Sequence, residues 1–97
     1  LLARNFHSRH GEIDLIMDDG RSLVFIEVRY RRSSAFGSGA ESVDRRKQAR
    51  ITACAQYYLQ KNPAASQRAC RFDVVAISGA RERRNIQWIR DAFPALG

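Results

Sequence analysis

The sequence has no apolar run long enough to cross a membrane, and no basic leader followed by an apolar segment. It therefore shows neither a membrane-spanning helix nor a signal peptide, and we expect a cytoplasmic protein with no membrane partner. Cysteine is also scarce, since only Cys54 and Cys70 occur, without the CxxC spacing of a metal site. A secreted domain held by disulfides usually carries more, so both cysteines are predicted to be reduced core residues.

Acidic residues are in the minority. Ten Asp and Glu stand against 17 Lys and Arg, which gives a net charge of +7. Of the basic residues only Lys47 and Lys61 are lysines. The arginine fork matches pairs of phosphate oxygens. A GC-rich genome would explain the arginine bias equally well, but it leaves the net charge unexplained, so nucleic acid is the expected partner.

The chain is short enough for one domain. Its 97 residues are 44% hydrophobic and 28% charged, a balance typical of globular rather than disordered proteins. No internal repeat is visible, and residues 1–97 are interpreted as a single domain. Because the chain opens at Leu1 with strand-like residues and no Met, we expect further residues to precede it.

Two alternating segments around a turn predict a β-hairpin. Residues 12–18 and 22–31 each alternate in polarity, and the sequence 18–21 (Asp-Asp-Gly-Arg) is typical of a tight turn. In the first segment Ile13, Leu15 and Met17 are predicted to share one side and Ile16 the other. Residues 1–7 are predicted to form a short additional strand.

The remaining pattern predicts a mixed α/β sheet. A helix is expected from an N-cap at Asp44 to about Lys61, where Asn62 and Pro63 end it. Residues 72–78 are almost continuously apolar, as in a strand buried on both faces, and residues 86–89 form a last strand. A strand, a helix and a buried strand in succession predict a β-α-β crossover with parallel strands.

The hairpin brings acidic residues together. With Gly20 and Arg21 at the turn, Asp14 lies opposite Glu27; with Asp19 and Gly20 there, Glu12 lies opposite Glu27. Both arrangements place four charged residues on one face: Glu12, Asp14, Glu27 and Arg29. Acids facing each other destabilise a sheet, and a divalent cation such as Mg²⁺ would relieve that repulsion. The alternative is a solvated lattice of ion pairs in which Arg29 neutralises the acids.

Several motifs then carry a family resemblance. Residues 11–16 (Gly-Glu-Ile-Asp-Leu-Ile) and 25–29 (Phe-Ile-Glu-Val-Arg) resemble the PD-(D/E)xK nuclease signature. With residues 40–43, 47–48, 71–75 and 88–93, they are similar to the YraN-like family of bacterial proteins, itself similar to Holliday-junction resolvases. The resemblance implies a restriction-endonuclease-like fold flanked by helices. It also implies an amphipathic helix before the first strand, which we expect to be missing from residues 1–97.

The resemblance also implies a site. Asp14 and Glu27, with the Val28 carbonyl, would bind Mg²⁺ or Mn²⁺, and Glu12 would be a further ligand or position water. Arg29 stands where the signature has Lys. Because Arg stays charged it cannot act as a general base, but it can bind the scissile phosphate. Gln48 resembles a glutamine that supports the site in related nucleases; an ordinary solvated helix residue is the alternative.

Other charged residues complete the expectations. Arg31 and Arg32 are predicted to contact phosphates beside the cut site. Asp73 interrupts an apolar strand, so it either reaches the acidic cluster or pairs with an arginine such as Arg71, which we favour. The predicted activity is a Mg²⁺- or Mn²⁺-dependent endonuclease acting on DNA, in preference to RNA, including branched recombination or repair intermediates.

Two alternatives stay open. One is a nuclease-fold module that binds nucleic acid without cutting it. The other is a basic structural partner of a ribonucleoprotein. Cutting two strands would favour a homodimer.

Overall fold

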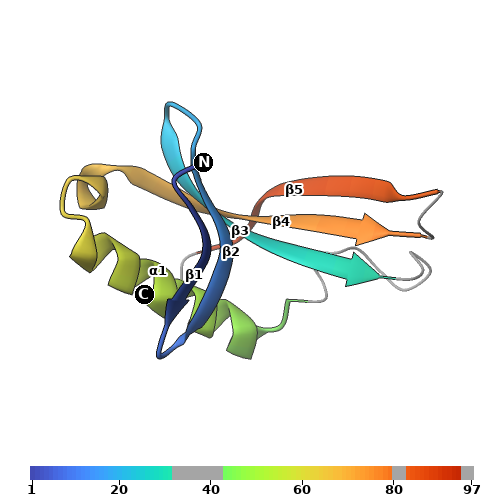
Figure 1. Cartoon of the computed structure of the whole chain (residues 1–97), viewed down its shortest axis with the longest axis horizontal. Helices are drawn as coiled ribbons and strands as arrows, with labels where there is room; N and C mark the ends of the chain where they lie inside the picture. The colour runs from blue at the N-terminus through green and yellow to red at the C-terminus, as the bar shows by residue number, and fades with distance from the viewer. Residues whose placement is uncertain (32–42, 80–82, 95–97) are drawn as a thin grey trace.

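The computed structural model describes residues 1–31, 43–79 and 83–94 (Figure 1). This part contains five strands, one α-helix and a short 3-10 helix. In chain order they are β1 (Ala3–Ser8), β2 (Gly11–Asp18), β3 (Ser22–Arg31), α1 (Arg45–Lys61), η2 (Ala65–Gln67), β4 (Ala69–Ser78) and β5 (Asn85–Phe93).

The strands form one mixed sheet in the order β1-β2-β3-β4-β5. β3 and β4 are parallel, and every other neighbouring pair is antiparallel. The predicted hairpin, the helix and the parallel crossover are therefore confirmed. β4 and β5 are both longer than predicted, since β4 begins at Ala69 and β5 continues to Phe93.

The tip of the β2–β3 hairpin settles its register. Asp18 pairs with Leu23, so Gly20 and Arg21 occupy the turn, the first of the two predicted alternatives. The Asp19 carboxylate accepts hydrogen bonds from the backbone N–H groups of Arg21 (2.9 Å) and Ser22 (2.6 Å). An aspartate that bonds to the backbone two and three residues on stabilises such a turn.

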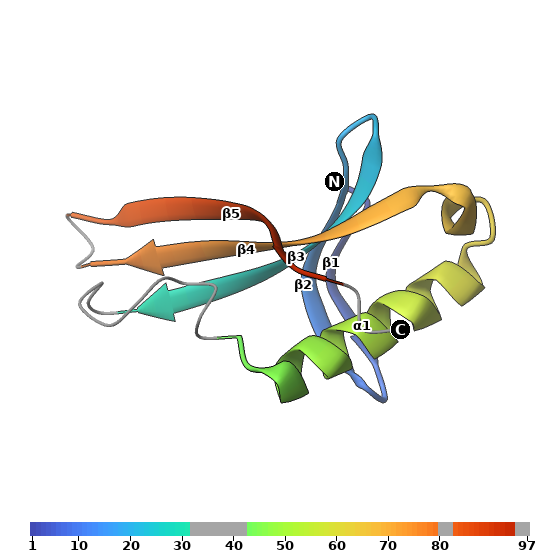
Figure 2. The same ribbon diagram turned by 180° about the vertical axis from the view of Figure 1, so that it is seen from behind.

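The core lies between α1 and one face of the sheet. In Figure 1, α1 lies behind β1 and β2 and below β3, β4 and β5; Figure 2 shows it in front of β1 and β2. Ile13 and Ile16 both belong to it, 1% and 0% exposed. The prediction that they point to opposite sides is wrong. Asn5 has a φ of 49°, and the β1–β2 ladder omits the Asn5–Asp14 position, so simple alternation is lost there. The main buried partners are Leu23, Phe25, Ile51, Cys54, Phe72 and Val74.

Helix α1 has the predicted ends. The Asp44 carboxylate accepts the backbone N–H of Lys47 at 2.8 Å, and Asn62 is the C-cap. Cys54, on the buried face of this helix, is a core residue as predicted. The prediction that Cys70 is a core residue is wrong, because that thiol is exposed. Cys70 lies in the first residues of β4, before the strand enters the core.

The opposite sheet face has no α-helix over it in the part of the chain that the structure describes. The far halves of β3, β4 and β5 also project beyond the end of α1 (Figures 1 and 2). Three large apolar side chains are exposed there: Tyr30, Ile86 and Trp88. Among residues 1–31, 43–79 and 83–94, no helix is both long and apolar enough to span a membrane.

Candidate active site

β2 and β3 part where the two principal acids lie. Their pairing runs from Asp18 and Leu23 to Leu15 and Ile26, and the next position in the same register would join Asp14 to Glu27. Instead, the Asp14 carboxylate enters the ladder, and its Oδ2 accepts the backbone N–H of Val28 at 2.7 Å. This bond satisfies a backbone donor that the partner strand leaves free. It also holds the Asp14 carboxylate between two separating strands.

Glu27 lies on the central strand and is buried, with 7% of its side chain exposed. Its Oε1 lies 2.8 Å from Lys47 Nζ and 3.7 Å from Arg29 Nη1. Burial raises the pKa of Glu27 above its ordinary value, and the negative charge of Asp14 adds to the effect, while Lys47 and Arg29 oppose it. A buried carboxylate next to another acid is stabilised in its charged form by a nearby positive charge. Here the Lys47 ammonium group supplies that charge.

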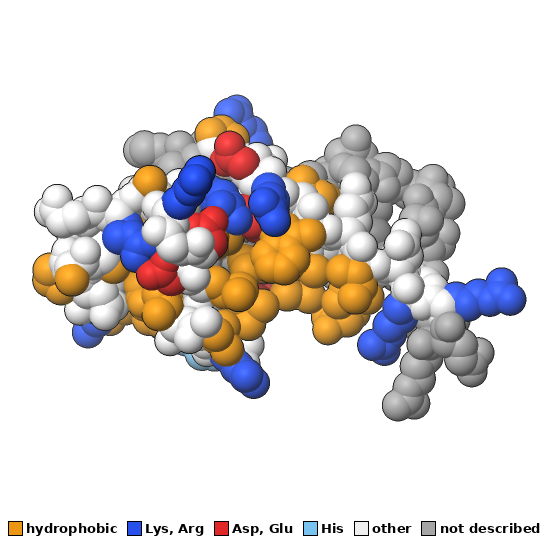
Figure 3. All heavy atoms as spheres, turned by 90° about the horizontal axis from the view of Figure 1, so that it is seen from above, with side chains coloured by type: hydrophobic (Ala, Val, Ile, Leu, Met, Phe, Trp, Pro, Cys, Tyr) orange, Lys and Arg blue, Asp and Glu red, His pale blue; other side chains and the backbone are white. Residues whose placement is uncertain are grey.

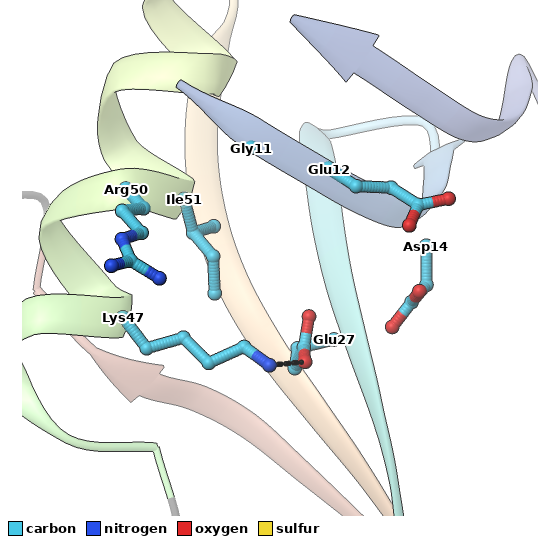
Figure 4. Close-up of a pocket in the computed structure, with 7 residues that line it drawn as sticks. All are labelled: Gly11, Glu12, Asp14, Glu27, Lys47, Arg50 and Ile51. Carbon is cyan, nitrogen blue, oxygen red and sulfur yellow. Dashed lines mark ion pairs between the residues drawn. The ribbon is translucent and has the colours of Figure 1, made fainter. Parts of the chain in front are cut away.

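These side chains border a hollow of about 240 Å³ between β2, β3 and α1. Figure 4 shows Lys47 reaching from the helix to Glu27, with Asp14 and Glu12 on the strand opposite. The lining therefore combines acids from the sheet with cations from the helix. Its members are Gly11, Glu12, Asp14, Glu27, Lys47, Arg50 and Ile51.

The structure brings Glu12, Asp14 and Glu27 to one hollow, as the hairpin pattern predicted. Glu12 differs from the other two, because its side chain is 40% exposed and its Oε1 lies 3.4 Å from Nε2 of His7 on the neighbouring strand. Glu12 therefore lies at the rim of the site. From there it is better placed to contact water or substrate than to contact Asp14 and Glu27.

Other predicted site residues lie around this hollow. Arg29 contacts Glu27 but does not line the hollow. The Gln48 amide donates to the Val43 carbonyl at 2.9 Å, at the start of α1, so its supporting role stays a prediction. Val28 contributes its N–H to Asp14, and its carbonyl as a ligand stays a prediction. The Arg31 side chain and Arg32 lie outside the described residues.

Lys47 and Arg50 are the site residues to which the sequence pattern assigned no role. Lys47 stands four residues before Ile51, so the two occupy the same face of α1. Ile51 is a core residue, and a lysine one turn before it on the same face can extend along the sheet to Glu27 on β3. That spacing is the signal that could have identified Lys47 as the second cation beside Glu27.

The donors suit a hard divalent cation. Within the described residues no group of three or more His, Cys, Asp or Glu side chains is arranged to hold a metal ion. Asp14 and Glu27, however, are close enough for the charge of one to affect the pKa of the other. Mg²⁺ is commonly held by one or two carboxylates, with waters and substrate phosphates completing its shell. A pair of oxygen donors facing a hollow fits that mode of binding.

Asp73 belongs to a different cluster. It is fully buried, and its carboxylate accepts from Arg71 Nε (3.0 Å), Trp88 Nε1 (2.8 Å) and the backbone N–H of Asp91 (3.0 Å). The favoured prediction, pairing with Arg71, is confirmed. By the β3–β4 register, Asp73 lies beside Ile26 and one residue out of step with Glu27, so it points to the other sheet face.

Comparison with known proteins identifies the family of the chain. The model of a family described as "Uncharacterised protein family UPF0102" matches residues 1–77. A UPF0102 protein of Nitrosococcus oceani is 56% identical over 93 residues, covering 96% of this chain and 75% of the relative. One from Saccharophagus degradans is 53% identical over 95% of this chain and 75% of the relative. One from Stutzerimonas stutzeri is 50% identical over 96% and 78%. The family resemblance seen in the motifs is confirmed, and the chain belongs to the family UPF0102.

Proposed function

We propose that the protein is a divalent-metal-dependent endonuclease that hydrolyses phosphodiester bonds in DNA, including branched intermediates, on a restriction-endonuclease-like fold. The observation that carries the proposal is the convergence of Asp14 and Glu27 from the sheet with Lys47 and Arg50 from α1 on one hollow. Acids for a cation and bases for a phosphate are the two requirements of metal-assisted phosphoryl transfer. The net charge of +7 supports a polyanionic substrate.

Each side chain has a role in this proposal. Asp14 and Glu27 would hold Mg²⁺ or Mn²⁺, which when bound polarises the phosphate and offsets its developing charge. Lys47 stands at hydrogen-bonding distance from Glu27, where the signature lysine is expected to act, and it can position the phosphate or the attacking water. Arg29, 3.7 Å from the same carboxylate, contributes positive charge but cannot accept a proton.

The decisive experiment is a cleavage assay. Supercoiled plasmid, single-stranded DNA and a four-way junction are incubated with the protein and Mg²⁺, Mn²⁺ or EDTA. Cutting of at least one DNA with either metal and none with EDTA is expected. If no substrate is cut with any metal, the endonuclease proposal is wrong.

A DNA-binding module without cleavage is the second candidate, and Arg29 in the lysine position of the signature favours it. Both candidates predict binding through phosphates. If about 4–6 phosphates are neutralised, log K should fall against log salt with a slope of about −4 to −5. Titration of a labelled duplex across salt concentrations measures that slope. A flat response, or no binding at low salt, contradicts both candidates and leaves a structural role.

A divalent cation is expected to stabilise the folded protein. At about 100 times its Kd, Mn²⁺ should add about 2.7 kcal/mol to the free energy of unfolding, measured as a rise in melting temperature. Asp14→Asn should remove the gain. Asp44→Asn is the matched control, because Asn caps a helix about as well as Asp and the change removes one charge away from the site. A gain that survives Asp14→Asn would place the cation elsewhere.

Lys47 is expected to matter more than Arg29 for cleavage. Lys47→Ala should lower kcat by about 10²–10³-fold, the usual cost of losing one positioned donor to the developing charge. Arg29→Lys should retain activity, because it keeps the charge and restores the signature residue. Arg45→Ala, an exposed change in the first turn of the same helix, is the control. Full activity in Lys47→Ala would mean that Arg29, and not Lys47, is the main cation acting on the phosphate.

A further inference from the structure

The sheet face turned away from α1 exposes two aromatic rings. Tyr30 is 73% and Trp88 49% exposed. The registers align Val28 with Val75 and Trp88, and Tyr30 with Ile77 and Ile86, so both rings project from the same face. They stand two strands and two residues apart, about 12 Å from the spacings of a sheet. In Figure 3 hydrophobic side chains gather in the middle of the molecule, with Lys and Arg side chains on either side and Asp and Glu side chains among the cations on one of them.

Each ring shares a hollow with an exposed arginine. Tyr30 lines a hollow of about 300 Å³ together with Arg4. Trp88 lines another, of about 330 Å³, together with Arg90 and with Asp18 and Asp19, whose carboxylates pair with Arg68 and Arg71. The indole is held in place, because its Nε1 donates to the buried Asp73 at 2.8 Å. An anchored ring with a cation beside it is the arrangement on which proteins stack bases while they hold the phosphates.

Asp14 connects this face to the active site. Asp14 lies where the strands part and lines both the hollow of Glu27 and Lys47 and the hollow of Arg4 and Tyr30. A strand with one phosphate at Asp14 would therefore continue past Arg4 to the ring of Tyr30 without leaving the protein surface.

We propose that this face, defined by Arg4, Tyr30, Trp88 and Arg90, binds the unpaired nucleotides of a DNA strand whose phosphate lies at the active site. The proposal rests on the proposed function and specifies its substrate as DNA with a single-stranded segment. Bases in a duplex rise by about 3.4 Å per step and are stacked on one another, so rings about 12 Å apart can be reached only by splayed bases. A second copy of the chain is the other possible occupant of this face, and the titration below distinguishes it from DNA.

Trp88 makes the test direct, because it is the single tryptophan of the chain. The protein is titrated in EDTA with an oligothymidine of about 12 nucleotides, and both indole emission and the anisotropy of a labelled oligonucleotide are followed. Saturable quenching of Trp88 that parallels binding is expected, with a duplex of the same length quenching much less. EDTA prevents metal-dependent cutting, so the result is independent of whether the strand is cut.

Variants separate stacking from charge. Tyr30→Ala should weaken oligothymidine binding about 5–150-fold, the range that corresponds to about 1–3 kcal/mol per stacked base, while Tyr30→Phe should bind within about twofold of the parent. Arg90→Ala should weaken binding more than Arg45→Ala, which removes the same charge from α1 on the other side of the sheet. Melting temperatures confirm that each variant is folded.

Three results would overturn the proposal. Oligothymidine could bind without changing Trp88 emission, or duplex could quench as strongly as the single strand. Emission could instead depend on protein concentration in the absence of DNA, which would identify the face as a contact between two copies. None of the three bears on metal-dependent cleavage, so the proposed function would be judged separately.

Discussion

Glu27→Gln is expected to abolish metal-dependent DNA cleavage, lowering the rate by about 10³-fold because several kcal/mol of transition-state stabilisation by the cation is lost. Gln keeps the size of the side chain and removes the charge that a cation requires. Burial already raises the pKa of Glu27 and so disfavours its charged form, and the variant should therefore fold. DNA binding should be retained or improved, because one negative charge leaves the path of the phosphate.

The measurement is a single-turnover cleavage rate with Mn²⁺, beside the affinity for the same DNA in EDTA. Glu12→Gln is the matched control, since it makes the same chemical change at the exposed rim of the same hollow. It should cost less than Glu27→Gln. Cleavage that continues unchanged in Glu27→Gln would mean that the site is wrongly assigned or that another nuclease is present in the sample.

Much of the fold could be predicted because its signals are local. The turn at residues 18–21, the alternation in β3 and the caps of α1 each depend on a few neighbouring residues, although the choice between the two turn registers came from the structure. The side of Ile13 could not be predicted, because it depends on the irregular stretch where Asn5 has a positive φ and Asp14 bonds to Val28. That irregularity arises between strands, and no pattern within β2 encodes it.

The acidic half of the candidate site followed from the hairpin, since both predicted registers place Glu12, Asp14 and Glu27 on one face. The basic half, Lys47 and Arg50, did not follow from the hairpin pattern. Lys47 is 20 residues from Glu27 in sequence, and residues 32–42 intervene, so its contact depends on how α1 packs on the sheet. The signature predicted Arg29 as the basic site residue. Its Nη1 lies 3.7 Å from Glu27 Oε1, whereas Lys47 Nζ lies 2.8 Å from the same atom. Whether a side chain on α1 reaches a carboxylate on β3 is decided by how the helix packs on the sheet.

Asp73→Ala is expected to lower the free energy of unfolding by about 3–5 kcal/mol, the usual cost of removing one partner from a buried charged pair. The change leaves the Arg71 guanidinium, the Trp88 indole N–H and the Asp91 backbone N–H without their shared acceptor. It also frees β5 at its irregular position, where the pairing with β4 shifts between Phe72 and Val74 and Asp91 has a φ of 52°. Equilibrium unfolding in urea measures the loss.

Two further variants show whether the buried acceptor is the cause. Asp73→Asn keeps one acceptor oxygen and should be less destabilising than Asp73→Ala. Asp19→Ala removes the other carboxylate bound to Arg71, together with its two hydrogen bonds to the backbone of the Gly20–Arg21 turn. These contacts lie near the surface, where an ion pair contributes little, so the effect should be smaller than that of Asp73→Ala. Because the Asp73 carboxylate holds the Trp88 indole, Asp73→Ala should also change Trp88 emission in the folded protein. If Asp73→Ala is as stable as the parent, the hydrogen bonds to Asp73 do not hold β5 on the sheet. The claim that Asp73 fixes the Trp88 indole on the aromatic face then fails as well.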